Sequence, residues 1–220
     1  LWSRGLGDVY KRQLIEAFSH MLVVNTDEGL VAFDSSGPAS GQRVIESLRR
    51  WDRSPIHTLI YTHGHIDHIG GSRAIAEEAR SSGRKLPEVV GHANLSSRMN
   101  RYRATEGYNK VINNRQFGGL PVSTFESSSG QRPFIPEGTL ELTREYERTM
   151  EFTVGGVEFE LHHAKGETDD HTWTWIPQHK MISAGDQFIW NFPNCGNPQK
   201  VQRYPLELSL IHISAPTRPE

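Results

Sequence analysis

The stretch that decides the fold is Thr62-His63-Gly64-His65-Ile66-Asp67-His68-Ile69-Gly70-Gly71. Residues 57–61 predict a short buried strand before it and residues 72–80 predict a helix after it, so the polar cluster lies at a strand-to-helix junction. In an extended backbone His63 and His65 share one face, while Asp67 and His68 follow the turn and can point back toward them. Imidazole and carboxylate together are typical ligands of zinc and its first-row neighbours.

The order H-x-H-x-D-H after a buried strand resembles the signature of the metallo-beta-lactamase superfamily. This resemblance implies an α/β fold, a four-layer αββα sandwich, which we expect to be incomplete at its C-terminal end. It also implies a metallo-hydrolase whose full-length parent holds two zinc ions. His63, His65, Asp67 and His68 would be metal ligands, and Asp67 would also serve in catalysis.

Two later segments extend the resemblance. His163-Ala164-Lys165-Gly166-Glu167-Thr168-Asp169-Asp170-His171 matches the family pattern H-x-P-G-H-T-x-G-H without a gap, and it puts Glu167 where a ligand histidine usually stands. A glutamate there resembles the alkylsulfatase-like branch of the family. Ile182-Ser183-Ala184-Gly185-Asp186 matches the strand whose aspartate bridges two metals in the family. We therefore expect Asp186 as a further ligand.

These matches give an expected arrangement of two metal positions. His63, His65 and Glu167 would share one metal, and Asp67, His68 and Asp186 would form the second position incompletely. A final ligand histidine of the family has no counterpart before residue 208. The other histidines near this segment, His162, His163 and His171, are expected beside the ligands or on the surface. Asp169 and Asp170 are expected on a solvated turn, where either could hold a ligand histidine in its tautomer.

Composition excludes several other classes. A net charge of −2 with 23% charged residues argues against a nucleic-acid binder. No apolar run reaches the eighteen or so residues of a membrane span. Cys195 is the single cysteine, so no intrachain disulfide can form, which favours a reducing compartment such as the cytoplasm. The oligomeric state is left open.

Both ends of the chain resemble translated sequencing-adaptor read-through. Residues 1–13 and 208–220 are interpreted as non-native tails, which leaves residues 14–207 as one truncated metallo-beta-lactamase-like domain. We expect both tails to make few specific contacts. Because the native N-terminus is not visible under this interpretation, a signal peptide remains compatible with the sequence.

Hydrophobic spacing predicts the other elements. Glycine and proline between residues 104 and 140 argue against any long element there. Predicted helices cover residues 42–51 and 94–103, and predicted strands cover residues 21–24, 30–33, 88–91, 151–154, 157–161, 172–176 and 180–183.

The chemistry expected of such a centre is hydrolysis by a metal-bound hydroxide, here of a small anionic or ester substrate, sulfate esters first. The alternatives are another hydrolase of the superfamily (lactonase, thioesterase, phosphodiesterase or beta-lactamase) and an inactive metal-binding fragment. Lacking one family ligand, the chain is expected to hydrolyse poorly. The candidate substrate-binding residues are Tyr108, Asn114, Arg115, Asn191 and Arg203, and an apolar channel is expected from Phe117, Phe188, Trp190 and Phe192.

Overall fold

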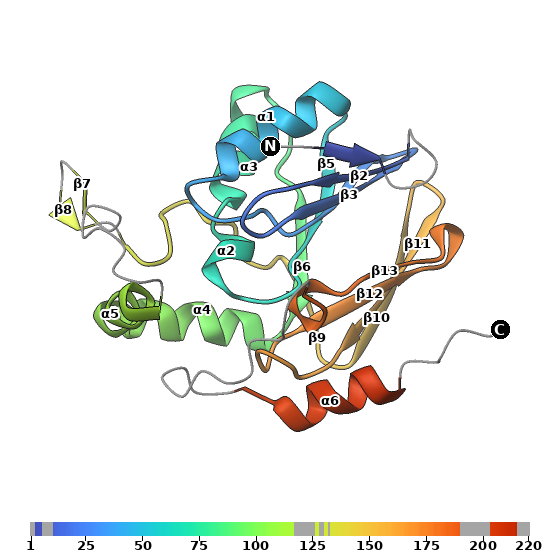
Figure 1. Cartoon of the computed structure of the whole chain (residues 1–220). Coiled ribbons are helices and arrows are strands. Elements are labelled where there is room, and N and C mark those ends of the chain that lie inside the picture. Colours follow the sequence, from blue (N-terminus) through green and yellow to red (C-terminus); the bar gives the residue numbers. More distant parts are fainter. Residues whose placement is uncertain are drawn as a thin grey trace.

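The computed structural model describes residues 3–5, 11–116, 126–127, 130–131, 133–189 and 203–214. Two β-sheets pack face to face, with helices on their outer sides (Figure 1). The larger sheet has the strand order β1-β2-β3-β4-β5-β6-β9, and the smaller has the order β10-β11-β12-β13. The α/β sandwich expected from the sequence is therefore present.

The larger sheet changes from antiparallel to parallel pairing at β4, and this change positions the site. Parallel strands end at the same sheet edge, so the segments that leave β4, β5 and β6 meet there. The strands are β1 (Ser3–Gly5), β2 (Arg12–Ile15), β3 (Met21–Thr26), β4 (Gly29–Phe33), β5 (Ile56–Ile60), β6 (Glu88–His92) and β9 (Arg144–Tyr146).

Two amphipathic helices, α1 (Gly41–Trp51) and α3 (Ser72–Ser81), cover the outer face of this sheet. Each turns its apolar residues inward, including the buried Leu48 and Ile75. A bidentate ion pair between Arg49 and Glu78 joins the two helices, with Nε 2.9 Å from Oε1. The apolar residues whose helical spacing was recognised in the sequence are thus those that pack against the sheet.

The region between residues 104 and 140 contains a helix that the sequence reading missed. After α4 (Asn94–Ala104) the chain forms α5 (Glu106–Gln116), so the expectation of no long element is wrong for these eleven residues. The helix-breaking residues Gly118, Gly119 and Pro121 all follow this helix, so they do not prevent residues 106–116 from being helical. Further on, β7 (Glu126–Ser127) pairs with β8 (Gly130–Gln131).

The smaller sheet is antiparallel and buries one face against the larger one. Phe159, Leu161 and Ile176 point into this interface and meet Phe33 and Ile60 from the larger sheet. Burial of these side chains is the main force that holds the sheets together. The strands are β10 (Thr149–Val154), β11 (Val157–His163), β12 (Thr172–Ile176) and β13 (Met181–Ser183), followed by the short helix η3 (Gly185–Gln187).

The ends of the chain make more contacts than expected. Residues 3–5 pair with β2, and Arg12 and Gln13 pair with β3, so the expectation of few specific contacts is wrong for these residues. Backbone hydrogen bonds extend a sheet edge with little regard to side chains, which explains how such a segment can join. At the other end α6 (Pro205–Ser214) buries Leu208 near Gly166. The non-native origin of both segments stays a prediction.

Among the helices that the structure describes, none combines the length and apolar character needed to cross a bilayer.

Gly71 allows a close approach between the signature stretch and the end of β4. A Cβ atom at this position would overlap the carbonyl oxygen of Ser35, which is rigid backbone. We expect Gly71→Ala to lower the free energy of unfolding by about 1–3 kcal/mol, as overpacking does. Urea denaturation measures this effect, with Gly107→Ala as the control because a Cβ there meets nothing within 4 Å. Equal stability of the two variants would contradict this account.

Candidate metal centre

The candidate ligands come from loops of both sheets. His63 and His65 follow β5, and Asp67 and His68 lie in the short helix α2 (Ile66–Ile69). Glu167 lies between β11 and β12, and Asp186 follows β13. Because β12 runs antiparallel to both β11 and β13, the two acids lie at the same end of the smaller sheet, near the point where β5 ends.

Four side chains offer ligand atoms that all lie within 4.8 Å of one another: His63, His65, Glu167 and Asp186. His63 Nε2 and His65 Nδ1 are 2.9 Å apart, and His65 Nδ1 is 3.7 Å from Glu167 Oε1. Two imidazole nitrogens and two carboxylate oxygens match the donor types of a zinc site. These four residues therefore fit a metal ion, and the sharing of one metal by His63, His65 and Glu167 stays a prediction.

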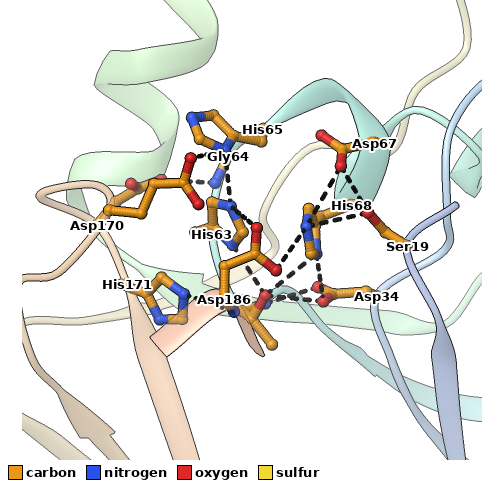
Figure 2. Close-up of polar contacts among 12 residues, drawn as sticks. Ser19, Asp34, His63, Gly64, His65, Asp67, His68, Asp170, His171 and Asp186 are labelled. Atoms are coloured by element: carbon orange, nitrogen blue, oxygen red, sulfur yellow. Dashed lines mark hydrogen bonds and ion pairs between the residues drawn. The ribbon is translucent and has the colours of Figure 1, made fainter. Parts of the chain in front are cut away.

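A second group of side chains meets at His68. Its Nε2 lies 3.3 Å from Asp186 Oδ1 and 3.6 Å from Asp67 Oδ2. Asp186 also reaches toward His63, with Oδ2 3.9 Å from His63 Nε2, so its carboxylate stands between the two groups (Figure 2). This is the placement expected of an acid shared by two metals. The use of Asp67, His68 and Asp186 as ligands stays a prediction.

Asp34 holds two residues of the signature stretch, Thr62 and His68, by hydrogen bonds. This buried residue has a φ of 59°, and its carboxylate accepts hydrogen bonds from Thr62 N–H (2.8 Å) and the Thr62 hydroxyl (2.7 Å). Its Oδ2 also lies 2.7 Å from His68 Nδ1. The Thr62 hydroxyl lies 3.0 Å from His63 Nδ1. Asp34 and Thr62 thus direct the Nε2 atoms of His63 and His68 toward the candidate ligands.

Burial and neighbouring charges move several pKa values. Burial lowers the pKa of His63 well below its usual range, and the nearby His68 adds to this effect. Burial opposes the charge on His68, but Asp34 and Asp186 outweigh it and raise the pKa of His68 well above its usual range. Burial alone would raise the pKa of Asp186, yet His68 lowers it to about 2. Because a ligand imidazole must be neutral, a metal ion bound at His68 would have to displace this proton.

Glu167 and Arg203 form a buried ion pair beside the candidate ligands, with side chains 4% and 6% exposed. Arg203 Nη1 contacts Glu167 Oε1 and also donates to the Glu167 carbonyl at 3.1 Å. Burial lowers the pKa of Arg203 to about 10, so the guanidinium stays charged at neutral pH. Its Nε and Nη2 are buried and have no hydrogen-bond partner among the described residues.

The turn after Glu167 differs from the sequence reading at Asp170. Asp169 is partly exposed, but the Asp170 side chain is fully buried, so a solvated turn is wrong for Asp170. Its carboxylate accepts from Gly64 N–H and from Arg98 rather than holding a ligand histidine. His171 is also buried, stacks on His63 at 4.6 Å between ring centroids, and accepts from Asp186 N–H at 3.1 Å. Burial lowers the pKa of His171 to about 4.

The candidate substrate-binding residues are spread more widely. Tyr108, Asn114 and Arg115 lie on α5, which follows α4 and lies at the end of α4 farther from the sheets (Figure 1). Phe188 is 73% exposed two residues after Asp186. Substrate contact by any of these residues stays a prediction. Asn191, Phe117, Trp190 and Phe192 lie outside the described residues.

Three residues of the site were not singled out from the sequence: Ser19, Asp34 and Arg98. The Ser19 hydroxyl donates to Asp67 Oδ2 at 2.5 Å and lies 3.2 Å from His68 Nε2. Each of the three contacts residues at least 28 positions away in the chain. Only Asp34 carried a local signal, because it directly follows a buried strand at the sheet edge where the signature stretch begins.

Asp186 and Asp169 provide a matched comparison of two partly exposed aspartates. We expect Asp186→Ala to lower bound zinc more than Asp169→Ala, because only Asp186 lies within the four-residue cluster. Metal analysis of zinc-loaded, desalted protein measures the difference. Equal zinc content in the two variants would show that Asp186 is not a ligand.

Known proteins match the chain over most of its described length. The family profile of the Metallo-beta-lactamase superfamily matches residues 15–189. Metallo-beta-lactamase type 2 of Bacillus cereus is 26% identical over 168 residues, which are 76% of this chain and 50% of that protein. An (R)-specific secondary-alkylsulfatase of Pseudomonas sp. is 25% identical over 184 residues, covering 76% of this chain and 27% of that protein. The chain thus spans about half, or less, of these relatives.

A solved structure agrees on the fold. The metallo-beta-lactamase from Pontibacter korlensis superimposes with a TM-score of 0.54 at 20% identity and covers 92% of this chain and 79% of that chain. The profile match includes the signature stretch, the strands of both sheets from β3 onward and the loops that carry Glu167 and Asp186. The chain belongs to the metallo-beta-lactamase superfamily.

Proposed function

We propose that this chain carries the centre of a metal-dependent hydrolase, with zinc as the metal and anionic esters, sulfate esters first, as substrates. The observation that carries the proposal is the convergence of His63, His65, Glu167 and Asp186 within 4.8 Å. A metal ion bound by such residues supplies Lewis acidity and lowers the pKa of water toward neutrality.

The protein's own side chains would orient the candidate ligands and accept a proton from the attacking water. Thr62 and Asp34 hold the imidazoles of His63 and His68 in place. Asp67 Oδ2 accepts from Ser19, which fixes the carboxylate at the partly exposed side of the site. We assign Asp67 Oδ1 as the atom that receives a proton from the attacking water.

Two observations favour an anionic substrate. Arg203 has a buried guanidinium beside Glu167 with two nitrogens that lack described partners, and a planar guanidinium suits the oxygens of sulfate or a related anion. The second is Glu167 itself, because a glutamate in place of the histidine of the family pattern resembles the alkylsulfatase-like branch. The similarity to a secondary-alkylsulfatase points the same way.

A substrate panel tests the proposal. We expect the zinc-loaded chain to hydrolyse a medium-chain alkyl sulfate faster than a lactone, a phosphate ester or a cephalosporin, relative to a His63→Ala control. The ratio of the hydrolysis rates of the different substrates decides the result, even if every rate is low. Faster turnover of the cephalosporin would favour the second candidate, a beta-lactamase, which the Bacillus cereus relative supports. Zinc binding without any hydrolysis would leave a metal-binding protein.

A further inference from the structure

Asp170 joins three segments that are far apart in the chain. Its side chain is fully buried, with Oδ2 accepting from Gly64 N–H at 2.7 Å and Oδ1 accepting from Arg98 Nε at 2.9 Å. Gly64 lies between two candidate ligands, and Asp170 comes three residues after a third, Glu167. One carboxylate therefore connects the two loops that carry most of the four-residue cluster (Figure 2).

Arg98 anchors this carboxylate from α4. The guanidinium is 4% exposed and also contacts Asp169, while Asn94 at the start of α4 donates to the Asp169 carbonyl at 3.0 Å. A buried carboxylate is stable only when it is paired and hydrogen-bonded. Here both conditions are met, so α4 holds the Asp169-Asp170 turn at a fixed place.

The fit around Gly64 is tight. A Cβ atom on Gly64 would stand 2.8 Å from Arg98 Cδ and 2.9 Å from Asp170 Oδ2. The loop between His63 and His65 thus has no room to move toward the ion pair, and the hydrogen bond to Asp170 keeps it from moving away.

From these contacts we infer that Asp170, held by Arg98, is a positioning residue that sets the distance between the His63-Gly64-His65 loop and Glu167. The inference rests on the proposed function of this cluster as a metal site. Metal ligands must keep their positions within a few tenths of an ångström, and residues that orient ligands affect metal affinity although they do not touch the ion.

The test compares Asp170→Asn with Asp169→Asn. In the carboxylate one oxygen faces Gly64 N–H and the other faces Arg98, and an amide at position 170 cannot keep both contacts because one of its two terminal atoms is a donor. The neighbouring Asp169→Asn keeps the shape, touches the same arginine and has no contact with Gly64. Zinc affinity is measured by competition with a chelator, and cobalt substitution reports ligand geometry through its visible absorption spectrum.

We expect Asp170→Asn to weaken zinc binding by about 10–100-fold, the range seen for residues that orient metal ligands, and to change the cobalt spectrum. Asp169→Asn should leave the spectrum unchanged. In the metal-free protein, hydrogen exchange at the Gly64 amide should speed up in the first variant only. Wild-type zinc affinity, spectrum and exchange in a folded Asp170→Asn protein would overturn the inference.

A second variant covers the case in which Asp170→Asn does not fold. Gly64→Ala keeps the ion pair but displaces it, so it should also weaken zinc binding and change the cobalt spectrum, whereas Gly107→Ala should change neither. Unchanged affinity and spectrum in Gly64→Ala would overturn the inference. Zinc binding without hydrolysis in the wild type would overturn only the proposed function. A wild type that binds no zinc would overturn both.

Discussion

Replacing Asp34 with alanine is expected to lower the free energy of unfolding by about 3–5 kcal/mol, the cost of removing one partner from a buried ionic contact. The change leaves Thr62 N–H, the Thr62 hydroxyl and His68 Nδ1 without their shared acceptor. It also places an alanine at a φ of 59°, a conformation that aspartate and asparagine adopt more easily than alanine, and this adds backbone strain. Urea denaturation in the presence of a chelator measures this effect without any contribution from metal.

Asp34→Asn is the control for this prediction. Asparagine tolerates a positive φ, and its carbonyl oxygen can still accept from Thr62 N–H. We expect a smaller loss of stability than for alanine but a similar loss of zinc affinity, because the orientation of His68 depends on the carboxylate. If the alanine variant were as stable as wild type, Asp34 would not organise the site.

Glu167→Ala is expected to remove a candidate ligand and leave the buried Arg203 without its carboxylate. Breaking a buried ion pair from one side costs about 3–5 kcal/mol, so stability should fall together with zinc affinity. The double change Glu167→Ala/Arg203→Met should recover part of the stability and none of the zinc affinity. Denaturation with chelator and zinc competition measure the two effects separately.

The exposed pair Arg103 and Glu141 supplies the comparison, with side chains 44% and 54% exposed. Glu141→Ala should change stability by less than about 0.5 kcal/mol, as surface substitutions usually do, and should leave zinc affinity unchanged. Recovery of zinc affinity in the double variant would show that Glu167 binds Arg203 rather than metal.

The sequence predicted the parts of the site that are encoded by local spacing. The run from His63 to His68 could be read directly because its residues are adjacent, and Glu167 and Asp186 could be placed because each stands in a short segment that resembles a pattern of the family. The roles of Asp34, Arg98 and Asp170 could not be read, since each depends on partners brought close only by the packing of distant segments.

The fold shows the same division. Strands and helices with clear periodicity were predicted within a few residues, including the hairpin of β3 and β4 and the helix α1. The helix α5 was missed because the glycines and prolines of the following segment do not bear on residues 106–116, and the pairing of residues 3–5 was missed because a sheet edge bonds through the backbone.

The four-residue cluster draws two ligands from each sheet, His63 and His65 from one and Glu167 and Asp186 from the other. Neither sheet alone presents this set, so binding at the cluster would be linked thermodynamically to the docking of the sheets. Free metal at a thousand times its dissociation constant would add about 4 kcal/mol to that docking. The melting temperature of this chain would then depend on metal concentration, and a chelator would loosen the sandwich at the edge where β5 ends.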